Sequence, residues 1–591
     1  MSPMARHAWL ALPLILFLSG ALTGLESHGL YMDGVNPDYL VARWLGEART
    51  EIRPWVLPGN LLLGRFPLLI QLYHGALPFW LGLPGYLLLG TDVAAVRMVH
   101  AGFGLLVLGG LYAFLMAFGA RRMAAIAALC VLALDPSFLL AFRTQFYITL
   151  LPLAFVLASA ALTECCGGRW AKLAAGFCAG LAVYGYFIHG MFLPVLLIHA
   201  ALRMRERRDA QGFCLWLLGA ALGGTPYPLG YAAAAASYGF MPAALVMALA
   251  WLGGLGFLAW LTTRGRPLRW LALATGLGVL ALMIGASTLP RASLLAPLTQ
   301  HLASLEPGRS ILTWGERVAL LAGLARLALD GGGEAVLLHA AMPGGHAALR
   351  LWLLLAILTL GAAALLWRRS PGWARGPLLV LGLMAAHLPL ALAFGDRLWV
   401  QHLVAMPVLL AALLGLALQA QRGRLAVLAL LVLPLGVPLG ALGAWDRHAV
   451  LRELERTGGV GLASDAITRF SREVARTLPN AVVRAPDWGV SMPFVMITGG
   501  RVAIQPDAPP AAMQADLCAG RPVVLVLLAQ GAEARMAAFA GTLGPARIAR
   551  YEQRDGRPVL VSASWLPPNA CGARADAATN PATAPAPAGA R

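Results

Sequence analysis

Long apolar runs alternate with short polar turns over most of the chain. Runs of about 20 residues, the length that a helix needs to cross a bilayer, recur from residue 8 to residue 443. One buried core would explain one such run but not a dozen. The pattern predicts an α-helical polytopic membrane protein of about 13 transmembrane helices. We expect these near 8–25, 96–118, 123–141, 145–163, 171–187, 190–203, 212–231, 241–262, 270–289, 349–367, 377–396, 399–418 and 425–443.

The polar turns indicate which way the chain lies in the membrane. With the amino terminus inside, every second turn faces the cytoplasm, and six of these turns carry 16 cations against three acids: 121–122, 164–172, 203–209, 263–269, 368–375 and 421–424. The long outer loops 26–95 and 290–348 hold four arginines against six acids and four against four. Basic short loops stay inside. The chain from residue 445 onward is therefore expected outside the cytoplasm. The first run is interpreted as a signal anchor, with a cleaved signal peptide as the alternative.

Composition narrows the class of partner. The chain of 591 residues is 59% hydrophobic and 12% charged, with a net charge of +18. Such a basic balance can indicate nucleic-acid binding, but the cations lie in short loops and form no basic helix. We therefore expect membrane lipids as partners and no nucleic acid. The Ala-, Gly- and Arg-rich, nearly lysine-free composition hints at a bacterium, which predicts the inner membrane with the carboxyl-terminal part in the periplasm.

The carboxyl-terminal part differs in pattern from the rest. Helical spacing at 464–478 and 532–543 alternates with β-rich runs, namely 481–485, 493–499, 501–505, 522–528, 547–553 and 558–564. This alternation predicts an extracytoplasmic α/β domain over 445–572, after a transmembrane domain over 1–444. The Ala/Pro-rich end, 573–591, is expected to be disordered. Cys518 and Cys571 either form a disulfide or remain reduced.

The loop 26–95 carries most of the candidate chemistry. Asp33 and Asp38 flank a short turn just beyond the first span, before a helix-like stretch at 39–44 that we expect at the membrane interface. A carboxylate there can take a proton from an acceptor hydroxyl or hold a divalent metal over a phosphate. Alternatively, Asp33 starts a turn before Gly34 and Asp38 caps the following helix.

Two more residues of this loop have open interpretations. Arg65 lies in an apolar setting near the membrane surface, where a guanidinium can bind a lipid phosphate with two donors. It can equally reach to headgroups without specificity. His74 is either a site residue or a structural histidine.

At this point the order of motifs resembles a known family, the bacterial branch of the protein O-mannosyltransferases and aminoarabinose transferases, within the glycosyltransferase C superfold. The matching segments begin with Asp33, Tyr39 and Ala42-Arg43, and continue with Gly64-Arg65-Phe66-Pro67-Leu68 and with GTDVAAVRMVHA at 90–101. Later segments match at 134–155 with Arg143, at 179–197 with His189, and at 395–413 with Arg397 and His402.

The resemblance implies a glycosyltransferase that uses a polyprenyl-phosphate sugar as donor. Asp33, with Asp38 as the second candidate, would deprotonate the acceptor hydroxyl, which displaces the lipid phosphate with inversion. Arg65, Arg397 and His402 would bind the donor phosphate, and Arg143, His189 and His74 are further candidates. The acceptor would be a lipid, a glycan or a protein. Asp33 is followed by glycine where relatives often have a second acid, and Gln145, Tyr147 and Thr149 occupy a stretch where relatives have another. Whether a divalent metal ion takes part therefore remains open.

Other classes of function fit the pattern less well. A lipid or sugar transporter or flippase typically shows internal repeats and ionisable groups at mid-membrane, whereas here the acids and arginines gather at the outer edge. An envelope assembly or sensory protein would not need so many spans. The transporter stays as the main alternative.

Overall fold

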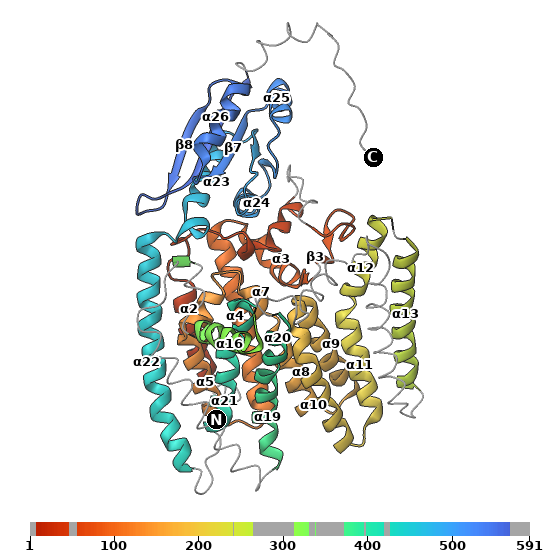
Figure 1. Cartoon of the computed structure of the whole chain (residues 1–591). Coiled ribbons are helices and arrows are strands. Elements are labelled where there is room, and N and C mark those ends of the chain that lie inside the picture. The colour runs from red at the N-terminus through yellow and green to blue at the C-terminus, as the bar shows by residue number, and fades with distance from the viewer. Residues whose placement is uncertain are drawn as a thin grey trace.

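The fold is helical below and α/β above (Figure 1). The computed structural model describes residues 8–45, 56–71, 73–239, 241–263, 312–329, 337–338, 371–394, 398–418 and 426–567. Within these ranges, five helical segments are long and apolar enough to cross a membrane: Val93–Ala117, Tyr147–Cys165, Phe187–Glu206, Ala244–Thr262 and Val400–Leu418. The expected spans 270–289 and 349–367 lie outside the described residues, so the count of 13 stays a prediction.

The helical part contains the following helices in chain order: α2 Ala11–Ala21, α3 Leu77–Leu89, α4 Val93–Ala117, α5 Arg122–Leu134, α6 Pro136–Ala141, α7 Tyr147–Leu150, α8 Leu153–Cys165, α9 Arg169–Gly185, α10 Leu193–Glu206, α11 Ala210–Gly224, α12 Pro226–Ser237, α13 Met241–Thr263, α16 Trp314–Leu329, α19 Pro371–Ala385, α20 His387–Phe394, α21 Met406–Leu418 and α22 Ala426–Thr457. The 3-10 helices η5 Phe187–Phe192 and η8 Val400–Leu403 precede α10 and α21.

Proline divides several of the expected spans into two helices. Pro136 begins α6, where Asp135 caps the helix by accepting a hydrogen bond from the Phe138 amide. Pro226 likewise begins α12 after α11. Proline lacks an amide hydrogen and is favoured in the first helical turn, so each apolar run becomes a pair of shorter helices.

Two glycine pairs let α9 and α11 approach closely. A Cβ added to Gly176 or Gly180 of α9 would lie 1.8 or 2.2 Å from a carbonyl oxygen of α11. The same holds in reverse for Gly219 and Gly223 of α11, at 2.0 and 2.3 Å from carbonyl oxygens of α9. Each pair is spaced four residues apart, the small-residue spacing that drives helix packing in membranes.

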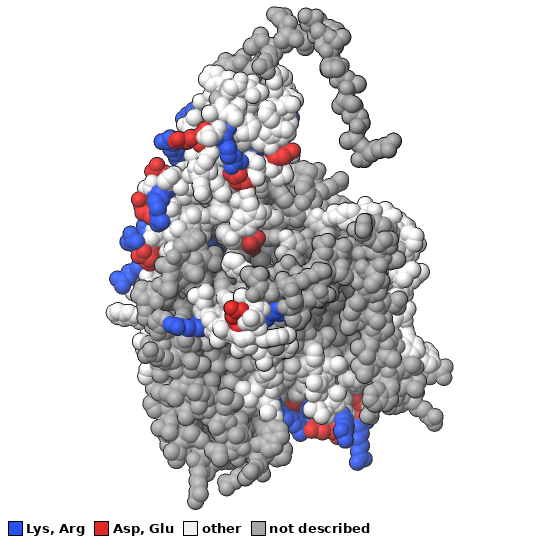
Figure 2. Space-filling model, viewed as in Figure 1, with Lys and Arg blue, Asp and Glu red and all other residues white. Residues whose placement is uncertain are grey.

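Three turns predicted to lie in the cytoplasm meet at one end of the helical part. Glu164 pairs with Arg203 at 2.8 Å and with Arg375 at 3.8 Å, while Glu206 pairs with both arginines at 2.8 Å. Figure 2 shows a group of positive and negative side chains at the lower end of the molecule. The shared end agrees with the expected topology; which side of the membrane it faces stays a prediction.

The loop 26–95 folds into short elements. These are the 3-10 helices η2 Asp33–Val35 and η3 Asp38–Arg43, two small hairpins (β1 Leu61–Leu62 with β2 Phe66–Pro67, and β3 Leu69–Gln71 with β4 His74–Gly75), and α3. The expected interfacial helix at 39–44 is instead η3, in which Asp38 through Ala42 are buried. It packs between α3 and the carboxyl-terminal helix α24, Ser491–Thr498, so an interfacial position was the wrong expectation. The loop also holds α3, which we did not anticipate.

A five-stranded sheet organises the carboxyl-terminal part, in the order β6-β5-β7-β9-β8. β5 Val482–Arg484, β6 Ala503–Gln505 and β7 Val523–Leu528 run parallel, whereas β9 Pro558–Trp565 is antiparallel to β7 and to β8 Arg547–Glu552. The helices α23 Ala466–Thr477, α24, α25 Pro510–Cys518 and α26 Ala532–Leu543 pack around it. α22 reaches this part by continuing past residue 445 to Thr457.

One expected element is of a different type. The run 493–499, taken as β-rich, is helical as α24. Every residue of α24 is buried, and a short, wholly apolar run does not distinguish a strand from a buried helix. Cys518 is disulfide-bonded, while Cys571 lies outside the described residues.

The carboxyl-terminal part docks on the loop that carries Asp33. Arg472 of α23 donates to both carboxylate oxygens of Glu26, at 3.1 and 3.0 Å, and to Asp92 at 2.6 Å. The Gly29 amide donates to the Ala463 carbonyl at 3.0 Å. A Cβ on Gly29 would lie 2.0 Å from the Ser464 carbonyl oxygen, so the two backbones are in direct contact. The position of the loop therefore depends on the carboxyl-terminal part.

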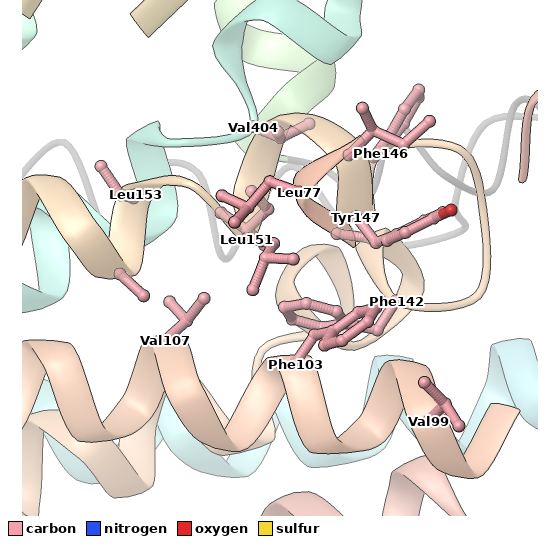
Figure 3. Packing of buried hydrophobic residues seen from close by; sticks show 14 of the residues in the cluster. Leu77, Val99, Phe103, Val107, Phe142, Phe146, Tyr147, Leu151, Leu153 and Val404 are labelled. Atoms are coloured by element: carbon pink, nitrogen blue, oxygen red, sulfur yellow. The ribbon is translucent and has the colours of Figure 1, made fainter. Parts of the chain in front are cut away.

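A continuous hydrophobic core supports the loop from below. Phe103 and Val107 of α4 pack toward Phe142, Tyr147 and Leu151 of the following segments (Figure 3). The same core cluster includes residues of α23 and α24. The membrane helices, the loop and the carboxyl-terminal part thus share one packed interior.

Candidate active site

A small polar cavity lies where the loop, the second hairpin and later segments meet. It measures about 90 Å³ and is lined by Asp33, Asn36, Gln71, Tyr73, His74, Gln145, Ile148, Thr149, Tyr186 and Gln401. A water molecule occupies about 30 Å³ of liquid volume, so the space suits a few waters or the hydroxyl-bearing end of a larger molecule. The predicted candidates Asp33 and His74 are thus brought together.

Asp33 is the only acidic residue of the cavity lining. Its carboxylate forms no hydrogen bond or ion pair with any other residue in the described ranges. Burial raises the pKa of Asp33 above the usual value of an aspartate. Burial of Tyr31, together with the nearby charge of Asp33, raises the pKa of Tyr31 to about 12. A carboxylate that is partly desolvated and lacks partners is a stronger base than a solvated one.

His74 supplies a second polar group to the cavity. It is buried, and its Nε2 has no hydrogen-bond partner within the described part of the chain. Its ring lies 5.8 Å from that of Tyr186, centroid to centroid. Burial lowers the pKa of His74 to about 3, so the imidazole is neutral near pH 7. It can therefore exchange a hydrogen bond with a bound hydroxyl but adds no charge.

A buried arginine anchors the start of the loop. Arg97 of α4 donates to the His28 ring nitrogen at 2.7 Å and to the Gly29 carbonyl at 2.9 Å. These bonds fix the chain a few residues before Asp33. Arg97 lies within the motif at 90–101, but no sequence pattern distinguished it from the rest of that motif.

Asp38 has a different environment from Asp33. Its side chain is fully buried, and its Oδ2 accepts hydrogen bonds from His100 Nε2 and from the Tyr147 hydroxyl, both at 2.8 Å. The His100 and Tyr147 rings stack with centroids 3.9 Å apart. Asp38 is absent from the cavity lining. This geometry favours a structural role for Asp38.

Arg65 lies on the turn of the first hairpin and is exposed. Its carbonyl accepts a hydrogen bond from the Trp44 indole, and the rings of Trp44, Phe66 and Trp80 lie within 6.4 Å of one another. Leu63 on the same turn is 91% exposed. Aromatic rings, an exposed leucine and a guanidinium together suit a lipid headgroup region.

The other predicted residues lie apart from the cavity lining. Arg143 donates to the carbonyls of Gly20, Ala21, Thr23 and Gly24, where α2 ends. A cation at a helix carboxyl end satisfies its open carbonyls. His189 is buried, with Nδ1 3.3 Å from the Tyr186 carbonyl. His402 accepts from the Trp399 amide at 3.0 Å and follows Gln401, which lines the cavity. Arg397 lies outside the described residues.

Several cavity residues were not proposed as site residues from sequence. Gln145 and Thr149 stood out only as departures from a family pattern. No sequence pattern indicated Tyr73, Tyr186 or Gln401 as site residues. They lie far apart along the chain and come together only in the folded structure.

The donor set argues against a protein-held metal at this cavity. Within the described ranges, no three His, Cys, Asp or Glu side chains are grouped so that they could hold an ion. The cavity itself offers one carboxylate and one histidine among neutral amides and hydroxyls. Mg²⁺ and Ca²⁺ prefer several oxygen ligands, usually with more than one carboxylate. We assign no step to a metal.

Comparison with known proteins finds a distant structural likeness. No protein-family model and no curated protein matches the chain. Among solved structures, the chain is similar to the crystal structure of ArnT from Cupriavidus metallidurans bound to undecaprenyl phosphate. The match covers 95% of this chain and 98% of that one, at 16% sequence identity and a TM-score of 0.37. A likeness this distant transfers no residue roles.

Proposed function

We propose that the chain is a membrane glycosyltransferase that moves a sugar from a polyprenyl-phosphate donor to the hydroxyl of an acceptor, at the periplasmic face of a bacterial inner membrane. The observation that carries this proposal is the Asp33 carboxylate, which has no hydrogen-bond or ion-pair partner among the residues that the structure describes and lines a small polar cavity. The surrounding fold of apolar helices supplies the setting for a lipid-borne donor.

In the proposed reaction, the acceptor hydroxyl enters the cavity and Asp33 takes its proton. The oxygen then attacks the anomeric carbon of the donor sugar. A new glycosidic bond forms, the bond to the phosphate oxygen breaks, and the polyprenyl phosphate leaves with the electron pair. Attack from the side opposite the phosphate inverts the anomeric configuration.

The cavity residues would act on the acceptor rather than on the phosphate. The neutral His74 ring and the amides of Gln71, Gln145 and Gln401 offer both donors and acceptors, which suits a hydroxyl. Positive charge for the phosphate must come from elsewhere. Arg65 would bind the lipid phosphate at the membrane surface, a proposal supported by its exposed position on a hairpin with aromatic neighbours; His402 and Arg397 are further candidates.

The test is sugar transfer in inverted and right-side-out vesicles with labelled polyprenyl-phosphate sugars, comparing wild type with Asp33→Asn. We expect turnover on one face only, lost in the variant while the protein remains folded. Activity retained by Asp33→Asn would move the base to another residue. Movement of the lipid-linked sugar across the bilayer without any transfer would replace the enzyme with the transporter alternative.

A further inference from the structure

A second, larger cavity lies wholly within the carboxyl-terminal part. It measures about 350 Å³ and lies between the end of α23 and the sheet face formed by β7, β8 and β9. Its lining comprises Glu473, Val474, Thr477, Leu478, Val524, Leu543, Pro545, Arg547, Ala549, Tyr551, Ser562, Ser564, Trp565 and Leu566. Ligand pockets typically measure about 300–1,000 Å³, so one sugar-sized molecule fits.

The cavity exists because the helix ends before the sheet does. Along β9, Val561, Ala563 and Trp565 belong to the core on one face of the sheet. On the opposite face, Leu560 packs in the core with α23, but the next two inward positions are Ser562 and Ser564. A sheet face covered by a helix is normally apolar. Ser562 and Ser564 make this part of the sheet face polar, which suits a polar ligand.

The polar groups that line the cavity are one carboxylate, one guanidinium and several hydroxyls. The Tyr551 hydroxyl donates to Glu473 Oε2 at 3.1 Å, which fixes the carboxylate at the rim. The Ser564 hydroxyl donates to the Arg547 carbonyl at 3.3 Å. The Arg547 guanidinium forms no ion pair within the described ranges, and Arg547 also lines the cavity.

From this set we infer that the carboxyl-terminal cavity binds a saccharide. A sugar hydroxyl both donates and accepts, so it can pair with the carboxylate, guanidinium and hydroxyls that line the space, while the Tyr551 ring offers apolar surface to its C–H groups. One cation is too few for a multiply charged phosphate ligand. The inference does not depend on the transferase proposal, because none of these residues lines the Asp33 cavity.

The test is saturation-transfer NMR on the purified full chain, in a detergent without a sugar headgroup. The probes are glucose, galactose, mannose, N-acetylglucosamine and glucuronate, with inorganic phosphate as the counter-probe. We expect at least one sugar to bind. Glu473→Gln and Ser562→Ala should each raise its Kd about tenfold, the effect of losing one hydrogen bond. Ala549→Phe, which fills the cavity, should abolish binding.

Matched controls keep the test decisive. Ser471 lies on the same helix, but its hydroxyl donates to the Ile467 carbonyl and the residue does not line the cavity. Sugar binding by Ser471→Ala should therefore be unchanged. Asp33→Asn should also bind sugar like wild type, which separates this site from the proposed active site. If Ala549→Phe misfolds, the half-buried Glu473 still tests the inference through Glu473→Gln. Binding of phosphate alone, of no sugar, or equal binding by the folded cavity variants would overturn it.

Discussion

Replacing Asp38 should destabilise the folded chain, because its buried carboxylate holds two donors together. Both hydrogen bonds, from His100 and Tyr147, end on the same oxygen, Oδ2. In Asp38→Ala both donors lose their acceptor in a fully buried site. Each unsatisfied donor costs about 1–3 kcal/mol, so we expect a loss of about 2–6 kcal/mol in the free energy of unfolding.

The conservative variant Asp38→Asn sharpens this prediction. Its carbonyl oxygen can take the place of Oδ2 and accept both bonds. The charge is lost, and the amide group takes the place of Oδ1, which is buried without a hydrogen-bond partner in the described residues. The difference between charged and neutral hydrogen bonds is roughly 1–2 kcal/mol for such a site. Asp38→Asn should therefore fall between wild type and Asp38→Ala, and should retain the activity that Asp38→Ala loses through misfolding.

The assay follows thermal unfolding in detergent through the reaction of buried thiols with a fluorogenic maleimide. Cys214 is buried and reports unfolding once the more accessible free cysteines, Cys130, Cys165, Cys166 and Cys178, are changed to serine. Asp33→Asn serves as the paired comparison, since Asp33 has no hydrogen-bond or ion-pair partner within the described residues. An unchanged unfolding midpoint in Asp38→Ala, with transfer abolished, would refute the structural role and make Asp38 a catalytic residue.

Three further predictions concern the loop and its contacts. Arg472→Ala should loosen the docking of the carboxyl-terminal part. Arg472 is 42% exposed and Glu26 and Asp92 are 50% exposed, so solvent limits the loss of stability to about 1 kcal/mol. Hydrogen exchange of residues 26–35 should rise, and unchanged exchange would contradict the contact. Gly29→Ala should raise the same exchange by forcing the backbones apart, and a variant that exchanges and melts like wild type would show that the approach is not tight. Because burial raises the pKa of Asp33, the acid limb of the kcat/KM profile should lie above about pH 3.9, the ordinary aspartate pKa. The unfolding free energy should fall as the pH rises from that value through the raised pKa, since Asp33 ionises first in the unfolded chain. A pH–stability curve identical in Asp33→Asn would contradict this.

Local pattern predicted the membrane helices and the acidic loop because both depend on short-range features. Apolar runs mark helices whatever their neighbours, and an acid just beyond the first span marks Asp33. The same reasoning missed α24, since a wholly buried segment has no polar face to reveal its period. It also missed α3, which lies in a loop that was expected to hold only an interfacial helix.

The site was only partly predictable for a related reason. Asp33 and Asp38 look alike in sequence, yet one faces a cavity and the other is held by His100 and Tyr147. That distinction depends on α4 and α7, more than 60 positions away along the chain. Arg143 was a candidate because its segment resembles the family pattern, and its contacts at the end of α2 arise only in the folded chain.

The central claim is that Asp33 is the base for sugar transfer, and the most direct measurement is the single-turnover rate of the purified chain with a polyprenyl-phosphate sugar and its acceptor. Asp33→Asn should slow transfer by about 10²–10⁴-fold, the contribution of a general base, with an unfolding midpoint no lower than that of wild type because burial disfavours the Asp33 charge. The exposed acid Glu533, 82% exposed and paired with Arg550, provides the control Glu533→Gln, which should react like wild type. Transfer by Asp33→Asn at the wild-type rate would contradict the account.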